Sequence, residues 1–192
     1  MFEKIPASLS RKLKSVRAGA NKVLCETEDF TDVPQTIMLE SAAFHDRDPI
    51  PMRFTADGDK VSPPLAWSGV PPEAESLVLV IEDPDAPKAK PFVHLIAVGI
   101  PADIDEIGEG AFSPDGSDSR LGRNSYLRAT YLPPDPPPGH GVHRYVFQLF
   151  ALDRKLATEK PGRGTLARGM RGRVLAKGVL VGTYERALSG GF

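Results

Sequence analysis

Five side chains with acid–base or hydrogen-bonding chemistry lie in or beside three apolar runs of the chain: Asp83, Asp85, His94, His143 and Tyr145. Imidazole and carboxylate groups placed together can transfer protons to and from a substrate, and the same groups can hold a divalent metal ion. Taken singly, each has an ordinary structural explanation, because Asp before Pro initiates turns and buried histidines are generally hydrogen-bonded. They form one site only if the fold brings the three runs together.

The three runs are predicted to be strands covered on both faces, because they are apolar without polar alternation. They are residues 77–82, 92–100 and 143–152. Shorter strands are predicted at 36–40 and 178–186, and a helix at 165–177, with Thr165 as its cap and a buried face made of Leu166, Met170 and Val174. No strand–helix–strand repeat occurs, so a doubly wound parallel sheet is not expected.

Alternation along a strand predicts which of these side chains share a face. His143 and Tyr145 are expected on one face at the start of their strand, directly after the proline-rich loop 131–141. His94 is expected on the same face of its strand as Ile96. A polar ring in such an apolar run requires a hydrogen-bond partner, because leaving it unpaired costs about 1–3 kcal/mol.

Residues 1–35 differ from the rest of the chain. They are predicted to form a basic, amphipathic helical extension and a linker, followed by one domain at 36–192. Apolar side chains recur in the extension every three or four residues, at Ile5, Leu9, Leu13, Val16, Ala20 and Val23. We expect this helix to pack on its own domain or on a second subunit. The alternative is weak contact with a membrane surface, which positive charge opposite an apolar stripe allows.

The composition argues against several classes of protein. The formal net charge of -1 gives no general attraction for nucleic acid. A single cysteine, Cys25, rules out an internal disulfide and zinc sites built on paired cysteines. No run approaches the roughly 20 apolar residues of a membrane span, and the first residues lack the apolar core of a secretion signal. We therefore expect a cytoplasmic protein.

Several ordered motifs resemble those of the phosphatidylethanolamine-binding proteins, also called Raf kinase inhibitor-like proteins. The signature regions are DPDAP at 83–87, FVH at 92–94, and PP-x-G-x-G-x-HRYVF at 136–147. Segments that resemble the bacterial and archaeal branch of this family are 50–71, 122–126 and 180–186. The resemblance covers residues 36–187, nearly everything after the N-terminal extension.

The resemblance implies a mainly β fold, a β-sandwich of two antiparallel sheets with a few short helices. It also implies a small anion-binding pocket at one end of the strands, for phosphate, acetate or a phosphoethanolamine head group. Carried over by motif position, the pocket residues are Asp83, Pro84, Asp85, Ala86, Pro87, His94, Pro136, Pro137, Gly139, His143 and Tyr145. In this pocket the imidazoles supply donors, and Asp83 or Asp85 orients a histidine. The Ala86–Pro87 bond is a candidate cis peptide.

One segment departs from the family pattern. The glycine-rich approach to the second signature, found in many bacterial members, is replaced by LRATYLPP at 127–134. The lost glycines are positions at which backbone could approach a ligand closely. We expect a narrower or reshaped rim.

The resemblance favours a binding or regulatory protein over an enzyme, with no cofactor, no bound metal and no catalytic residue. Its ligand would be a small phosphorylated or carboxylated molecule, its protein partner a kinase or a protease, and its assembly a homodimer. The alternative is a hydrolase that uses His94, His143 and an Asp, or a metal enzyme with Asp83 as third ligand. No Ser–His or Cys–His nucleophile is evident, since Cys25 lies in the extension. A third hypothesis is a protein-interaction module acting through loops 101–142.

Overall fold

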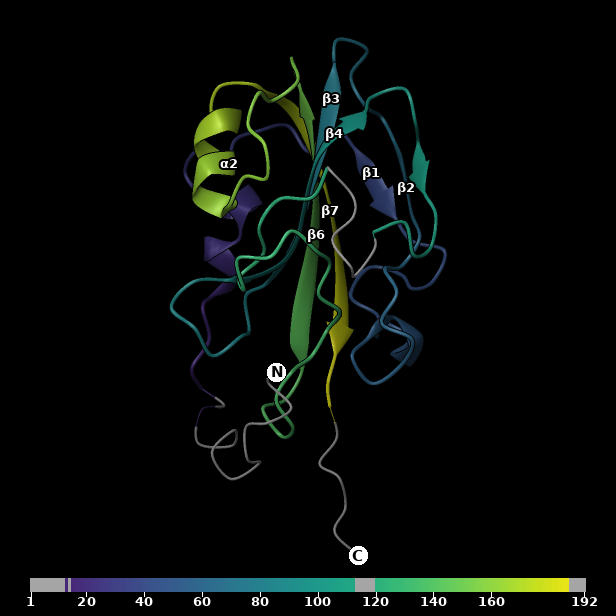
Figure 1. Ribbon diagram of the computed structural model, residues 1–192, viewed down its shortest axis with the longest axis vertical. Helices are drawn as coiled ribbons and strands as arrows, with labels where there is room; N and C mark the ends of the chain where they lie inside the picture. The colour runs from purple at the N-terminus through teal and green to yellow at the C-terminus, as the bar shows by residue number, and fades with distance from the viewer. Residues whose placement is uncertain (1–12, 14, 113–119, 187–192) are drawn as a thin grey trace, which may run out of the picture.

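The structure, a computed structural model, describes residues 13, 15–112 and 120–186. Two antiparallel sheets face each other (Figure 1), which confirms the mainly β, two-sheet prediction. The four-stranded sheet has the order β4-β3-β6-β7, and its strands are Ser76–Asp83 (β3), Phe92–Pro101 (β4), His143–Leu152 (β6) and Val174–Tyr184 (β7). The three-stranded sheet has the order β1-β2-β5, with Met38–Glu40 (β1), Leu65–Ser68 (β2) and Glu106–Ile107 (β5).

The larger sheet is covered on both faces, which explains why its strands are apolar without alternation. Its inner face packs on the smaller sheet through a core that includes Leu79, Phe147 and Trp67. Its outer face packs on the helix α2 (Arg163–Met170) and on the N-terminal segment, by which we mean the described residues from 13 to 35. Every residue of β3, the central strand beside both β4 and β6, is buried. The three long predicted strands are therefore confirmed almost to the residue.

The predicted helix at 165–177 is correct only in its first half. The helix α2 ends at Met170, and Val174 already begins β7. Gly172 has a φ of 69°, a left-handed conformation that ends the helix and turns the chain into the strand. The cap is Gly162 rather than Thr165, whereas Leu166 and Met170 are buried as expected.

The described part of the predicted N-terminal helix is not α-helical. Two short 3-10 helices, Ala20–Lys22 (η2) and Leu24–Glu26 (η3), follow Gly19, whose φ of 104° no α-helix accommodates. Buried side chains of the sheet bind the main chain here: the amide of Leu24 donates to Glu82 Oε2, and the amide of Cys25 donates to Gln148 Oε1. These contacts use backbone groups that a helix would need for itself. The part of the pattern at 1–12 lies outside the described residues.

The remaining helix in the described part of the chain is a short 3-10 turn, Met52–Phe54 (η4). No helix in the described ranges has the length and apolar character required to cross a membrane.

Candidate functional site

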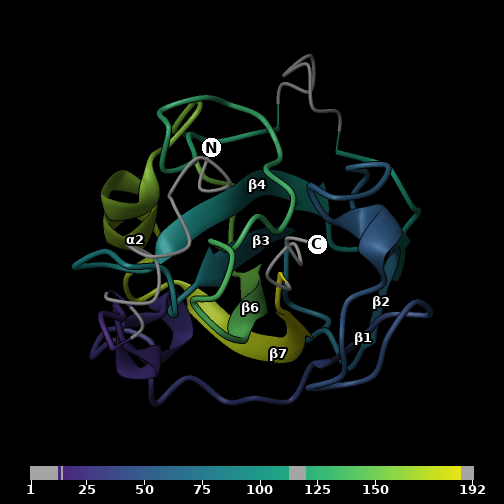
Figure 2. The same ribbon diagram turned by 90° about the horizontal axis from the view of Figure 1, so that it is seen from below.

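The chemistry-bearing residues meet at the end of the four-stranded sheet where β7 ends, at the bottom of Figure 1 and facing the reader in Figure 2. Asp83 is the last residue of β3, and His143 is the first residue of β6. Because β3 runs antiparallel to both β4 and β6, its end lies beside their beginnings. The topology thus brings Asp83, His94, His143 and Tyr145 to one edge of the sheet.

A β-bulge directs His94 into this site. Ile81 pairs with Leu95 and Glu82 pairs with Val93, so His94 is an extra residue in β4. A bulge of this kind changes the face to which the following side chains point. The prediction that His94 shares the face of Ile96 is therefore wrong: Ile96 packs in the outer core, whereas the His94 ring lies 5.1 Å from the Tyr145 ring on the inner face.

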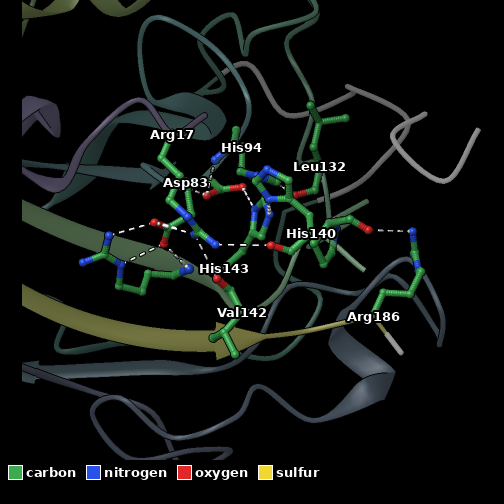
Figure 3. Close-up of polar contacts among 12 residues, drawn as sticks. Arg17, Asp83, His94, Leu132, His140, Val142, His143 and Arg186 are labelled. Atoms are coloured by element: carbon green, nitrogen blue, oxygen red, sulfur yellow. Dashed lines mark hydrogen bonds and ion pairs between the residues drawn. The ribbon is translucent and has the colours of Figure 1, made fainter. Parts of the chain in front are cut away.

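A chain of hydrogen bonds links one carboxylate and two histidines (Figure 3). Asp83 Oδ2 lies 2.7 Å from His143 Nδ1, His143 Nε2 lies 2.7 Å from His140 Nδ1, and His140 Nε2 lies 2.8 Å from the carbonyl of Leu13. The expected carboxylate partner of a histidine is thus Asp83. His140 is absent from the predicted site. Its position in the Gly-His-Gly sequence three residues before His143 is the signal that could have found it.

This chain fixes a proton count. The Leu13 carbonyl only accepts, so His140 Nε2 must donate to it, and each of the two other contacts also needs one proton. An ionised Asp83 and two neutral imidazoles carry too few protons for three hydrogen bonds. All three bonds can form together only if the cluster holds one proton more.

Two buried polar atoms in the site have no hydrogen-bond partner among the described residues: His94 Nε2 and the Tyr145 hydroxyl. The other ring nitrogen of His94, Nδ1, lies 2.9 Å from the carbonyl of Leu132 and donates to it. Burial lowers the pKa of His94 and so favours the neutral ring. Since buried polar groups are nearly always paired, two neighbouring exceptions are unusual.

Asp85, by contrast, is saturated by arginines. Its carboxylate accepts from Arg144 Nε and Nη2 at 2.8 Å each and forms a 2.8 Å ion pair with Arg17 Nη1. Burial alone would raise its pKa, but the hydrogen bonds from Arg144 and Arg17 lower the pKa of Asp85 to about 2. Asp85 is thus ionised and already paired with two arginines, which leaves its carboxylate little capacity to bind a ligand.

The rest of the DPDAP motif forms the turn after β3. Asp83 Oδ1 accepts the amides of Asp85 and Ala86, the pattern by which Asp stabilises a turn. Ala86 is fully buried, and the carbonyl of Pro84 accepts the amide of Gly19 at 3.0 Å. No cis peptide bond occurs in the described residues, so the expected cis bond before Pro87 is wrong.

The proline-rich loop closes the site beside this turn. Pro136 and Pro137 are buried, and Gly139 has a φ of 74° that favours glycine. Arg186, which sequence reasoning missed, holds the loop: its Nη1 donates to the carbonyl of Pro136 at 3.0 Å and to Asp135 at 2.7 Å (Figure 3 shows its approach). Segment 127–134, which departs from the family pattern, also contacts the site. The amide of Leu132 donates to the carbonyl of His94, and the His94 ring donates to the carbonyl of Leu132.

The placement of the possible metal ligands and of the single thiol bears on the metal-enzyme and nucleophile alternatives. Within the part of the chain that the structure describes, no group of three His, Cys, Asp or Glu side chains is placed to hold a metal ion. Cys25 is buried on the outer face of the sheet, and burial raises the pKa of its thiol to about 12. The thiol therefore stays protonated and away from the site.

These features define a two-sheet β protein with a histidine–aspartate site at one end. A model of the phosphatidylethanolamine-binding protein family matches residues 40–185. The chain belongs to the phosphatidylethanolamine-binding protein family.

Individual relatives agree with this assignment. A UPF0098 protein from Methanothermobacter thermautotrophicus is 43% identical over 154 residues, covering 77% of this chain and 98% of the relative. A phosphatidylethanolamine-binding protein homologue from Chlamydia trachomatis has a TM-score of 0.71 at 34% identity and covers 79% of this chain and 99% of its own. YbcL from E. coli, a member of the mammalian phosphatidylethanolamine-binding protein family, has a TM-score of 0.71 at 25% identity, over 78% of this chain and 98% of YbcL.

Proposed function

We propose that this protein is a non-enzymatic binding protein whose site takes a small ligand with a phosphate or carboxylate group. The observation that carries the proposal is a pair of buried atoms without a hydrogen-bond partner among the described residues, His94 Nε2 and the Tyr145 hydroxyl, on rings 5.1 Å apart. The site lies at the end of the sheet, in a family named for the binding of phosphatidylethanolamine.

The neutral state of His94 favours an anion that itself carries a proton. With Nδ1 donating to Leu132, a neutral His94 presents Nε2 as an acceptor beside the Tyr145 donor. A singly protonated phosphate or a carboxylic acid matches this pair, because its O–H donates to Nε2 and another oxygen accepts from Tyr145. A fully ionised ligand would require a protonated His94. A carboxylate or a phosphomonoester is mostly ionised at neutral pH, so its binding would take up one proton and its affinity should rise as the pH falls.

The hydrogen-bond chain supports binding over hydrolysis. In a nucleophilic relay the histidine turns its free nitrogen toward a hydroxyl or thiol. Here His143 turns that nitrogen toward His140, and His140 turns its own toward a main-chain carbonyl. The chain therefore ends on a group that cannot attack a substrate.

The test is calorimetric titration with inorganic phosphate and phosphoethanolamine. Tyr145→Phe and His94→Gln each remove one polar contact, and His45→Gln, an exposed histidine, is the matched control. We expect millimolar or tighter binding by the wild type and the control. Each site variant should lose about tenfold in affinity, as expected for one hydrogen bond of about 1.5 kcal/mol. Equal binding of both ligands would assign recognition to the phosphate alone.

The proposal is wrong if the folded wild type binds neither ligand at millimolar concentration. It is equally wrong if the two site variants bind as tightly as His45→Gln. Turnover of a phosphate or carboxylate ester by the wild type that His94→Gln abolishes would favour the hydrolase alternative.

A further inference from the structure

A segment outside the family match contacts the site. The match begins at residue 40, whereas Leu13, Arg17 and Gly19 all bond to loops of the site. The carbonyl of Leu13 accepts from His140, and the amide of Gly19 donates to the carbonyl of Pro84. The strongest of these contacts are made by the Arg17 guanidinium.

Arg17 joins two loops that are far apart in sequence (Figure 3). Its Nη1 lies 2.8 Å from Asp85 Oδ1 and donates to the carbonyl of Val142 at 3.0 Å. Its Nη2 donates to the carbonyl of His140 at 3.3 Å. One guanidinium thus links the turn that follows Asp83 to the loop that carries His140, a role that suits a planar fork with several donors.

The positive charge of Arg17 also affects the electrostatics of the site. Asp83 and Asp85 are two buried carboxylates beside a site that would receive an anion. Arg144 and Arg17 both bind Asp85, and only 30% of the Arg17 side chain is exposed. Loss of the Arg17 charge would leave one guanidinium for two carboxylates, which raises the repulsion felt by an incoming anion.

We propose that Arg17 is a positioning residue of the site, and that through it the N-terminal segment increases the affinity of the site for phosphate. The part of this inference that concerns affinity rests on the proposed function. The part that concerns the placement of His140 can be measured without any ligand.

The readout for placement is the protonation of His140. Burial lowers the pKa of His140, and the positive charge of Arg17 contributes in the same direction. The other groups that face this ring are the Leu13 carbonyl and Asp83, which raise its pKa, and His143, which lowers it. Removal of the Arg17 charge should therefore raise the pKa of His140, whereas a lysine at this position should keep it low.

The experiment compares Arg17→Gln and Arg17→Lys with Arg171→Gln in the full-length chain. Arg171 also pairs with a carboxylate of the N-terminal segment, Asp29 at 2.8 Å, but it lies directly after α2 and away from the site, so Arg171→Gln is the matched control. Each variant is titrated with inorganic phosphate, and its histidines are titrated with pH by NMR. We expect Arg17→Gln to bind phosphate about tenfold more weakly, in proportion to one charged contact.

The two readouts should agree across the set. Arg17→Lys keeps the charge but not the fork, so it should keep the pKa of His140 low and recover part of the affinity. Arg171→Gln should match the wild type in both. Unchanged or tighter phosphate binding by Arg17→Gln would overturn the inference, and so would an unchanged His140 titration. No binding by the wild type, with His140 still shifted in Arg17→Gln, would contradict the proposed function and support the positioning role.

Discussion

Neighbouring residues on β3 point to opposite faces of the same sheet and belong to two very different polar clusters. Glu82 faces outward and joins Gln148 and Lys177, where the N-terminal main chain and Arg163 satisfy all three. Asp83 belongs to the site cluster, where His94 and Tyr145 each keep an unpartnered atom among the described residues. Both clusters are buried, so burial does not separate them. The difference is hydrogen-bond satisfaction: the outer cluster is paired with the main chain of a distant segment, and the inner one keeps two unpaired atoms among the described residues, which we propose are the ligand contacts.

The largest effect that tests this comparison is on stability, in the outer cluster. Lys177 Nζ donates to three carbonyls, those of Cys25, Phe30 and Thr31. Lys177→Met removes these bonds and leaves buried acceptors unpaired, which should lower the free energy of unfolding by about 3 kcal/mol. Phosphate affinity should stay within about twofold of wild type. Denaturant unfolding measures the first quantity and calorimetry the second; a loss under 1 kcal/mol would contradict the structural role.

A second, intermediate effect is the pH dependence of stability, which separates the two kinds of group in the site. The pKa of His94 lies below its ordinary value of 6.5, so the unfolded chain takes up this proton first. Its stabilising contribution is complete above about pH 6.5 and is lost as the pH falls through the folded pKa. Asp85, with a pKa of about 2 against an ordinary 3.8, keeps its contribution down to about pH 4 and loses it toward pH 2.

The measurement is the melting temperature from pH 8 to pH 2, with His94→Gln and Asp85→Asn alongside. His94→Gln should flatten the decline below pH 6.5, and Asp85→Asn the decline below pH 4. Identical profiles for wild type and His94→Gln above pH 4 would show that His94 is not held neutral by burial.

The smallest expected effect is the sharpest test of the open cluster. Because the Tyr145 hydroxyl has no partner in the described structure, Tyr145→Phe removes a buried group that is not hydrogen-bonded. Without ligand, the variant should be as stable as the wild type or more stable by up to about 1 kcal/mol. A loss of 1 kcal/mol or more in denaturant unfolding would mean that the hydroxyl is already satisfied.

Sequence reasoning succeeded where local pattern determines structure. The strands at 77–82, 92–100 and 143–152 were predictable because each is a long apolar run, and the shared face of His143 and Tyr145 follows from alternation alone. The motif resemblance located Asp83, His94, His143 and Tyr145, which the fold brings to one edge.

The failures have a common cause in contacts between distant parts of the chain. The face of His94 depends on a bulge in its pairing with β3, and no local pattern reports a bulge. The N-terminal helix is absent from the described residues because Glu82, Gln148 and Lys177 capture its main chain from far away in sequence. Arg17 and Arg186 were missed for the same reason: the local sequence around an arginine carries no sign of the carboxylate that it will meet.

The most direct test of the central claim follows the imidazole nitrogens of His94 by NMR while inorganic phosphate is added. The account predicts that Nε2 shifts with saturation, that Nδ1 keeps its hydrogen bond to Leu132, and that Tyr145→Phe weakens the response. A saturable shift at Nε2 would place the anion between His94 and Tyr145. Phosphate binding that leaves Nε2 unchanged, or no binding by the folded protein, would contradict the claim that this open pair is the ligand site.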